Sequence, residues 1–483
     1  MRTSLQNTID SNGRGMLVRL CVLALVALLS ATAHARGVSP YLPLQQSPEI
    51  ERKIERLLIL ADRPVLTRPI AAATVFDALP KACERDAALC DEVKRYLAGF
   101  MRAAGISYAS VSAGGGSGAD VSLPNRHGMT SLSHYEVAGA VYWQPGDYLL
   151  VSGGVLAYDG ETTPTGSVVS LGMEYAQLDL GYRDHWWSSL TDSAMAISTQ
   201  AATLPSITIS NYTPLTRWNL RYEMFIGELS ESANIAFQGG LTTGKPRLAG
   251  VHLEIEPLPG WSLGVNRVLQ YGGGGRQDSF GDLFDAFFNP ADNDNAGARN
   301  PTEFGNQVAS FTSRFLIQDP LPFAVYFEYA GEDTSTLSNL RLGNSALSTG
   351  IDLPSLWRNF ALTIEVSEWQ NAWYEHHIYF DGLRHQDHVL GHWGGDWRER
   401  GDEVGARSWF ARLGWQPKFG GLIETSYRQL DNDDYSGRDY ATARHLEARY
   451  SRSWQQFFIG AELTVGESVF GESYSRVSGF MRF

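Results

Sequence analysis

The chain has 483 residues and a formal net charge of -14, which argues against nucleic-acid binding because that function needs basic surfaces. Charged residues make up 19% of the chain, against about 25% in an ordinary soluble domain. A mean hydropathy of -0.21 is too polar for a helical membrane protein, and abundant aromatic residues exclude a disordered chain. With 49 glycines as well, this composition favours β-structure.

Residues 1–35 are predicted to be a secretory signal peptide. Arginines precede an apolar run at 20–29, and Ala-His-Ala at 33–35 has the small-x-small pattern of a cleavage site. The run is too short to cross a bilayer as a helix, which needs about 20 residues. A translation start at Met1 and a start at Met16 both fit this interpretation.

Two cysteines, Cys83 and Cys90, remain after the signal peptide is removed. An even pair in an exported protein predicts a disulfide bond between them. Two thiolates without a nearby histidine are too few for a metal site. We therefore expect neither a metal nor a cofactor.

Residues 36–105 are predicted to form a small helical bundle in the periplasm. A first helix is expected from Ser47-Pro48, an N-cap followed by proline at the first helical position, up to Pro64. A second is expected at 72–79, ended by Pro80, and a third at 91–104.

From residue 106 to residue 483, apolar and polar residues alternate with the period of a β-strand. Leu362, Ile364 and Val366, for example, alternate with polar neighbours, which gives each strand one apolar and one polar face. About eighteen antiparallel strands are expected, at 106–113, 134–144, 148–158, 167–176, 177–186, 217–225, 232–243, 248–257, 261–271, 305–317, 322–332, 358–367, 373–382, 404–416, 421–430, 442–452, 456–466 and 475–483.

The lengths of the connections favour a transmembrane barrel over a soluble sandwich. Tight connections follow even-numbered strands, and the longer connections all follow odd-numbered ones, although 244–247 on that side is short. This is the parity expected for outer loops and periplasmic turns. The last strand ends on Phe483, which resembles the sorting signal of outer-membrane barrels. We predict an all-β barrel in the bacterial outer membrane, closed because lipid cannot satisfy an open strand edge, surrounded by outer-membrane lipids and monomeric.

The polar strand face would point into the lumen and carries charges of both signs, such as Arg314, Glu328 and Glu365. A network of ion pairs that stiffens the wall is favoured over a selective pore, because no single sign is concentrated. The long loops and the helices are further candidates to plug the lumen.

Two aromatic segments in long loops are candidate ligand-binding sites. Tryptophan faces stack on sugar rings, while Asp, His and Arg hydrogen-bond sugar hydroxyls. An equally supported alternative places these rings in the membrane girdle or in packing over the barrel mouth. The candidate residues are His185, Trp186, Trp187, His392, Trp393, Asp396, Trp397 and Arg398.

Catalysis is not expected. The sequence contains neither a Gly-x-Ser-x-Gly nucleophile elbow nor a His-Glu-x-x-His metal motif. We predict that the protein is not an enzyme.

The sequence resembles the capsule assembly protein Wzi family over nearly the whole mature chain. The resemblance is carried by Trp186-Trp187 running into 196–200 and 205–207, by Asn306-Gln307 and Arg314, by 329–333, and by 390–396. The sequence departs from the family at Ser188-Ser189, where the family pattern has Gly-Pro.

This resemblance implies an eighteen-stranded outer-membrane barrel with a periplasmic helical bundle. It also implies a lectin-like protein that anchors capsular or related exopolysaccharide to the cell surface, so a surface polysaccharide is the expected partner. The alternative function is an outer-membrane channel for diffusion or polysaccharide export.

Overall fold

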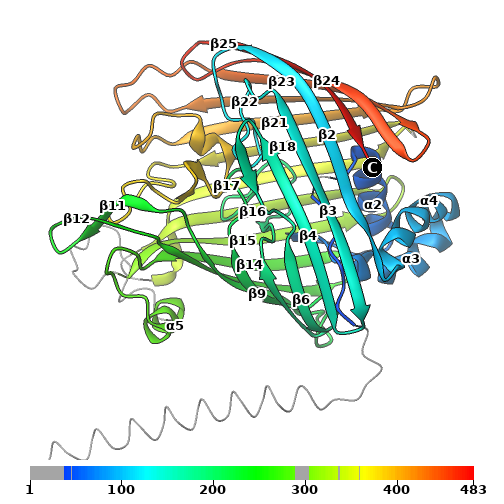
Figure 1. Ribbon diagram of the computed structural model, residues 1–483, viewed down its shortest axis with the longest axis horizontal. Helices are drawn as coiled ribbons and strands as arrows, with labels where there is room; N and C mark the ends of the chain where they lie inside the picture. The colour runs from blue at the N-terminus through cyan, green and yellow to red at the C-terminus, as the bar shows by residue number, and fades with distance from the viewer. Residues whose placement is uncertain (1–36, 45, 289–303, 336–337, 358) are drawn as a thin grey trace, which may run out of the picture. The chain divides into compact units, whose positions relative to one another are not determined.

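The computed structural model describes residues 37–44, 46–288, 304–335, 338–357 and 359–483. The predicted signal peptide, 1–35, lies outside the described residues. Residues 38–483 form one compact unit, in which a closed antiparallel barrel follows three helices (Figure 1). None of the described helices is long and apolar enough to cross a membrane.

The helical part comprises α2 (Pro48–Leu60), α3 (Ala72–Arg85), α4 (Ala87–Leu97) and the short 3-10 helix η1 (Ala98–Met101). Their apolar faces pack into one cluster that includes Leu57, Val75 and Val93. A disulfide joins Cys83 of α3 to Cys90 of α4, with the two Cα atoms 5.3 Å apart.

Two helix boundaries differ from the predicted ones. Helix α3 continues through Pro80, because Leu79 and Ala82 on either side of the proline are both buried in the helical core. Helix α4 begins at Ala87 instead of 91, because the Asp86 carboxylate accepts a hydrogen bond from the Leu89 amide and caps the first turn.

Helix α2 lies against the inner wall of the barrel. Arg52 forms an ion pair with Glu424, Arg314 forms one with Glu55, and Ser451 donates a hydrogen bond to Glu49. Figure 1 shows α2 at the mouth of the barrel, with α3 and α4 beyond it. The helices therefore cover the end of the barrel at which the tight turns lie.

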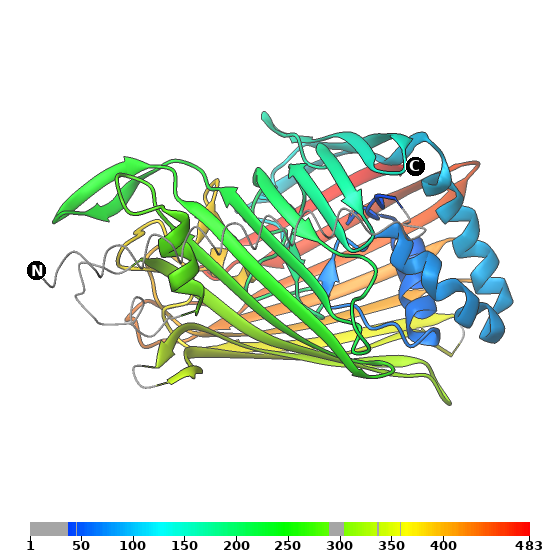
Figure 2. The same ribbon diagram turned by 90° about the horizontal axis from the view of Figure 1, so that it is seen from below.

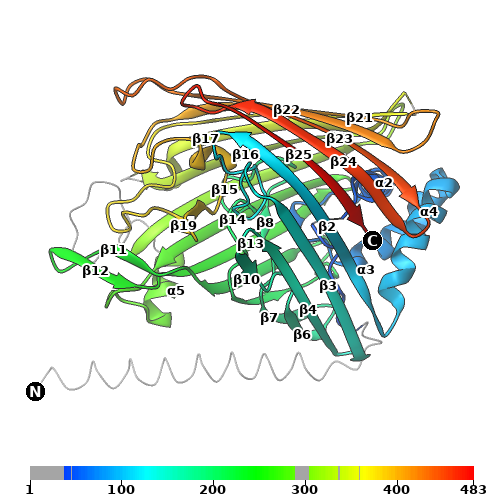
Figure 3. The same cartoon turned by 45° about the horizontal axis from the view of Figure 1, so that its top comes forward.

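The barrel wall has eighteen strand positions among the described residues, because β5 and β6 both pair with β4 and occupy one position together. The wall closes where β25 pairs with β2, as Figure 3 shows. Its strands are β2 (Ala104–Gly118), β3 (Tyr135–Gly146), β4 (Leu149–Tyr158), β5 (Glu161–Thr163), β6 (Val168–Met173), β7 (Ala176–Gly181), β9 (Ser206–Ser210), β10 (Arg221–Glu228), β13 (Arg247–Leu258), β14 (Trp261–Tyr271), β15 (Gly305–Ile317), β16 (Phe323–Ser335), β17 (Ser338–Leu356), β18 (Phe360–Trp369), β21 (Ala406–Trp415), β22 (Leu422–Asn432), β23 (Ala443–Trp454), β24 (Phe457–Glu467) and β25 (Ser473–Arg482).

Two predicted strands are wrong. Segment 232–243 forms a separate hairpin, β11 (Ser232–Phe237) and β12 (Gly240–Gly244), and segment 373–382 is a turn-rich loop. The two segments pack on each other, since Ile235 lies in a buried cluster with Ile378 and Tyr379. Their apolar residues are thus buried outside the wall, and Figure 2 shows the hairpin projecting from the loop end.

Two barrel strands, β9 and β17, were expected to be loop. Strand β9 is only Ser206–Ser210, and β17 is rich in Ser, Asn and Gly, so neither shows a strong apolar alternation. The missed and the wrong strands are equal in number, so the predicted total of eighteen is correct. Every long connection still leaves the barrel at one end, with the helices and tight turns at the other.

The outer face of the wall is apolar and the inner face is polar. Exposed residues include Val265, Phe311 and Leu347, whereas their strand neighbours Asn266, Ser310 and Ser348 are buried in the lumen. This alternation is the reverse of a soluble protein and fits a barrel surrounded by lipid.

We expect Val265→Arg, in the middle of β14 on the outer face, to lower the free energy of unfolding by about 2–4 kcal/mol because the charge must enter hydrocarbon. Urea titration in lipid vesicles measures this change. The matched control is Leu241→Arg in the β11–β12 hairpin, an exposed apolar position outside the wall, which should change the free energy little. Equal effects of the two variants would contradict the assignment of the outer face to lipid.

Candidate functional site

Three long connections, 119–134, 182–205 and 370–405, fold back into the lumen. Two of them meet in an apolar cluster in which Trp187, Met195, Leu204, Trp373 and Trp393 are buried. We call these packed side chains the plug layer.

The plug layer reaches almost every part of the wall. On the wall side, the same cluster includes inward-facing residues of the strands from β10 to β25, namely Phe225, Leu248, Val268, Val308, Ala330, Ala346, Trp369, Ala406, Leu430, Ala443 and Tyr474. On the remaining side, Leu123 and Met129 of the first connection pack against Tyr108, Leu156 and Tyr158 of β2 and β4. Packed apolar side chains of the loops therefore share a cluster with every strand position of the wall except those of β24, β6, β7 and β9.

Three of the predicted ligand residues belong to the first aromatic segment. Glu223 of β10 accepts hydrogen bonds from His185 Nδ1 at 2.7 Å and from Trp187 Nε1 at 2.9 Å, and it also pairs with Arg183. Trp186 donates from Nε1 to the Leu190 carbonyl at 3.0 Å. These contacts fix the segment to the inner wall.

The same segment is also tied to the stretch between α2 and α3. The short strand β1 (Thr67–Arg68) pairs antiparallel with β8 (Trp186–Trp187). The stretch between α2 and α3 thus supplies a strand to the underside of the plug layer.

The second aromatic segment contains η2 (Trp393–Asp396) and is held from several sides. Trp393 Nε1 donates to Asp192 at 3.0 Å, and Asp192 also pairs with Arg428 of β22. The His392 side chain accepts a hydrogen bond from the Gly394 amide through Nδ1, and its Nε2 lies 3.0 Å from Ser408 Oγ.

Asp396 is the centre of a buried polar cluster. Its carboxylate accepts hydrogen bonds from Arg384 at 2.7 Å, His388 at 2.9 Å and Gln200 at 2.8 Å. Burial opposes ionisation, but the His388 hydrogen bond and the Arg384 charge outweigh it and hold the pKa of Asp396 below its ordinary value of 3.8. Asp396 is therefore a charged anchor within the plug.

Of the last two predicted residues, Trp397 joins two connections and Arg398 holds its own connection together. Trp397 Nε1 donates to the Ser122 carbonyl at 3.0 Å and so links two connections. Arg398 donates to the carbonyls of Val404 and Trp373.

All eight predicted side chains are buried in or beside the plug layer. Their ring faces are covered by protein, as when His185 stacks on Phe225 with 4.2 Å between ring centroids. Their assignment as ligand contacts stays a prediction. The contacts themselves give them a structural role in holding the plug, which is the packing alternative.

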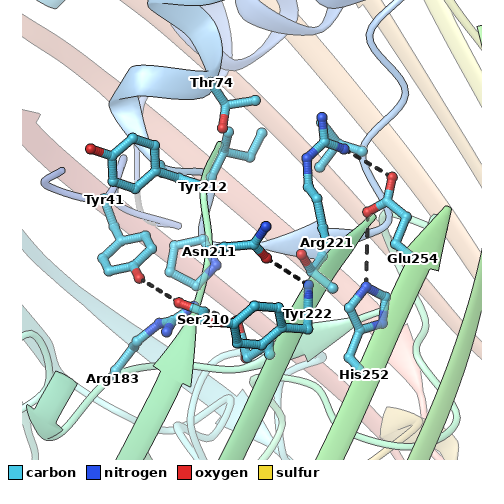
Figure 4. Close-up of a pocket in the computed structure, with 16 residues that line it drawn as sticks. Tyr41, Thr74, Arg183, Ser210, Asn211, Tyr212, Arg221, Tyr222, His252 and Glu254 are labelled. Atoms are coloured by element: carbon cyan, nitrogen blue, oxygen red, sulfur yellow. Dashed lines mark hydrogen bonds and ion pairs between the residues drawn. The ribbon is translucent and has the colours of Figure 1, made fainter. Parts of the chain in front are cut away.

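Between the plug layer and α2 lies a polar cavity of about 240 Å³. Its lining carries charges of both signs, with Arg449 2.8 Å from Glu447. Arg449 also lies 2.7 Å from Glu462, behind the lining. A smaller neighbouring pocket of about 50 Å³ contains the Arg221–Glu254 ion pair at 3.0 Å (Figure 4). These paired charges brace the wall, as the ion-pair interpretation predicts.

Aromatic rings that the sequence did not single out are exposed at the loop end. Tyr435 and Phe470 are each 57% exposed, and the Tyr440 ring lies 6.1 Å from that of Phe470. We call these three residues the outer aromatic surface. They lie in two connections that the sequence predicts only as loops of modest length. Nothing in the sequence besides their aromatic side chains indicates a surface for a ligand.

Charged and polar groups lie beside the outer aromatic surface. Tyr440 donates a hydrogen bond to Asp402 at 2.6 Å, and the half-exposed Arg438 pairs with Glu399. Among the described residues, no group of three or more His, Cys, Asp or Glu side chains is arranged to hold a metal ion.

These observations define a class: a closed outer-membrane β-barrel whose lumen is filled by its own loops and whose outer end presents aromatic and charged side chains. The sequence matches the family described as "Capsule assembly protein Wzi" over residues 107–462. The chain belongs to this family.

Solved structures of other proteins are similar to this chain. The structure of Wzi from Escherichia coli, described as an outer membrane protein involved in group 1 capsule assembly and as a carbohydrate-binding β-barrel, is similar with a TM-score of 0.68 and 15% sequence identity. The likeness covers 90% of this chain and 98% of that one and shows the shared barrel fold. Pseudomonas aeruginosa OccK5 is similar with a TM-score of 0.46 and 11% identity over 79% of this chain and 96% of that one.

One relative is similar in sequence over a short segment. A Klebsiella pneumoniae protein, described as "Uncharacterized 55.8 kDa protein in cps region", is 35% identical over 91 residues. The match covers 18% of this chain and 17% of that protein, so it spans only a small part of either.

We expect the plug to loosen in acid through His392. Burial lowers the pKa of His392 from 6.5 to about 4, so the ring stays neutral in the closed plug at pH 5 but becomes protonated once exposed. Its Nδ1 would then no longer accept the Gly394 hydrogen bond. Lowering the pH from 7 to 5 should therefore reduce the free energy of local opening by about 2 kcal/mol.

Hydrogen exchange at the Gly394 amide measures this opening. His392→Gln, which keeps an acceptor but does not titrate, should remove most of the pH dependence. His134→Gln, at an exposed histidine outside the plug, is the control and should leave it unchanged. A pH dependence that survives in His392→Gln would contradict this assignment.

Proposed function

We propose that this protein is a non-enzymatic anchor that binds surface polysaccharide at the loop end of a plugged barrel and attaches capsular or related exopolysaccharide to the cell. The observation that carries the proposal is the plug layer. A lumen filled by apolar side chains in contact with the wall leaves the outer surface as the place for a large polymer.

The family assignment supports a role in capsule assembly, and the E. coli relative is described as carbohydrate-binding. A binding protein needs a rigid surface more than a moving one, since ordering loops on binding costs conformational entropy. The ion pairs and hydrogen bonds of Asp192, Glu223 and Asp396 supply that rigidity from below.

The outer aromatic surface has the chemistry for a sugar chain. Exposed rings such as Tyr435 and Phe470 offer flat apolar faces for pyranose rings, and the nearby charged groups can hydrogen-bond hydroxyls. The chain is acidic overall, so an anionic polymer would need cations such as the half-exposed Arg438 and Arg400 at this end.

We assign the eight residues predicted from sequence an indirect part in binding. His185, Trp187 and Trp393 hold the plug loops, and Tyr440 of the outer aromatic surface is hydrogen-bonded to Asp402 of one of them, so their loss would disturb binding through loop order. Direct contacts belong to the exposed rings.

The channel alternative is less well supported. A selective pore concentrates one sign of charge at a constriction, whereas the lumen carries charges of both signs and many of them are paired, as in Arg126–Glu462 at 3.0 Å. A diffusion channel would also need the plug layer to leave the lumen, which exposes buried tryptophans to water.

We expect Tyr435→Ala and Phe470→Ala each to weaken binding of the host's surface polysaccharide about ten-fold, the loss of roughly one stacking contact. Binding of purified protein to that polysaccharide measures the change, and cells carrying the variants should release polymer into the medium. Trp218→Ala, an exposed ring at the tight-turn end, is the control and should bind like the unaltered protein.

Two further variants separate direct from indirect roles. Trp186→Ala and Trp393→Ala should weaken binding only together with faster hydrogen exchange in the plug. Unchanged binding in both Tyr435→Ala and Phe470→Ala would contradict the proposed location. Polymer that stays cell-bound in a strain lacking the protein would contradict the proposed function.

We expect the purified protein to give no stable single-channel currents in a planar bilayer, because the plug layer blocks the lumen. A general diffusion porin in the same membrane is the positive control. Large, stable currents from the unaltered protein would favour the channel alternative.

A further inference from the structure

One end of the polar cavity between the plug layer and α2 is lined by three arginines, Arg126, Arg449 and Arg482. The guanidinium groups of Arg449 and Arg482 lie over the same Phe480 ring, with 6.0 Å and 4.6 Å between Cζ and the ring centroid. Arg126 and Arg449 share the carboxylate of Glu462, at 3.0 Å and 2.7 Å. Three positive charges therefore lie close together on the inner side of the plug.

Arg482 differs from the other two arginines because it lacks an acidic partner. Arg126 also lies 3.3 Å from Glu136, and Arg449 lies 2.8 Å from Glu447. In the part of the chain that the structure describes, no acid forms an ion pair with Arg482, and no oxygen accepts a hydrogen bond from it. A guanidinium carries five N–H donors and stays charged in proteins. The donors of Arg482 are thus available to a ligand.

The position of Arg482 at the end of β25 directs its side chain into the lumen. Its neighbour Met481 is exposed on the outer face, whereas Phe480 is buried, as strand alternation requires. Arg482 pairs with Ser110 of β2, and both residues line the cavity. Figures 1 and 3 show this end of β25 on the side of the barrel where α2 lies.

The cavity reaches solvent beside α2. Glu51 of α2 lines the cavity, and its side chain is 37% exposed. The cavity is therefore accessible from the tight-turn end without any movement of the plug layer. At about 30 Å³ for each water, its volume of about 240 Å³ corresponds to roughly eight waters, which is enough room for inorganic phosphate or for one monosaccharide.

We propose that Arg482 and Arg449 form a binding site for one oxyanion, either a phosphate or the carboxylate of an acidic sugar, on the periplasmic side of the plug. Guanidinium groups bind both kinds of anion through paired, charge-assisted hydrogen bonds. Arg449 can contribute through Nη1, since the acid nearest to that atom, Glu424, is 3.9 Å away.

Electrostatics favours an anion over a neutral ligand at this end of the cavity. The acids beside the three arginines are already bound by Arg126 and Arg449, so the charge of Arg482 is opposed by its two neighbours. A bound oxyanion relieves this repulsion. The site goes beyond the proposed anchoring function and does not depend on it, because the outer aromatic surface lies at the opposite end of the barrel.

Isothermal titration calorimetry of the full, detergent-purified protein at low, fixed ionic strength tests this site. The probes are inorganic phosphate, galacturonate and neutral galactose. We expect at least one of the two anions to bind with a Kd below about 1 mM, and galactose not to bind. Arg482→Gln should weaken anion binding about ten-fold or more, because hydrogen bonds to a charged group are lost.

Arg444→Gln is the matched control. Arg444 is also a strand arginine whose nearest acid is 3.9 Å away, but it is exposed at the loop end, so this variant should bind anions like the unaltered protein. Urea unfolding separates a ligand site from a structural role. Removing Arg482 leaves no carboxylate without its partner, so Arg482→Gln should match the unaltered protein without anion, and added anion should stabilise only the unaltered protein. Arg482→Lys keeps the charge and should fold and bind more weakly.

The outcomes distinguish the source of the anion. Binding of phosphate alone would identify free phosphate, and stronger binding of galacturonate would identify an acidic sugar; both support the site. Failure of both anions to bind the unaltered protein, equal binding of galacturonate and galactose, or anion binding that survives in Arg482→Gln would overturn it. Binding of the host polysaccharide should be unchanged in Arg482→Gln, so failure of this site is distinguishable from failure of the anchoring function.

Discussion

The structure depends on one constraint: inside a bilayer, backbone amides and carbonyls can find hydrogen-bond partners only in neighbouring strands. This forces the strands to close, as they do where β25 pairs with β2. Closure in turn creates an interior, and an interior lined by arginine and glutamate must be hydrated or filled. Here ion pairs, helix α2 and three long loops fill it, and the outer end becomes a fixed surface.

Filling the interior explains why buried charges are tolerated. Glu223 accepts hydrogen bonds from Arg183, His185 and Trp187 at once, and Asp192 accepts them from Trp393 and Arg428. A buried carboxylate with several donors loses little by leaving water, whereas one with a single lost partner would be costly. The plug is consequently a cooperative unit in which each loop depends on the others.

Much of the fold could be predicted from the sequence, because a period-two alternation such as Leu362 to Val366 indicates a wall strand with an apolar face towards lipid and a polar face towards the lumen. The predicted family, the strand total and the side on which the long loops lie all agree with the structure. The errors have one cause. Ile235 and Ile378 alternate like wall residues but pack on each other outside the wall, while the polar β17 joins the wall with little apolar signal.

The candidate site was harder to predict for a related reason. Trp187, Trp393 and Asp396 were recognised as unusual for loops, but the sequence does not say whether a loop folds inward or outward. Only the structure reveals their partners, Glu223, Asp192 and Arg384, which are far from them along the chain or on different elements. Exposed rings such as Phe470 carried no such local signal.

The pairing of β1 with β8 bears on the order of assembly. Thr67 and Arg68 reach the underside of the plug from a segment that precedes every wall strand in the chain. A cylinder that had already closed would have to admit this strand through the end that α2 covers. The geometry instead favours a route in which the amino-terminal segment is enclosed as the sheet curls around it, so that the interior is built before the seam is sealed.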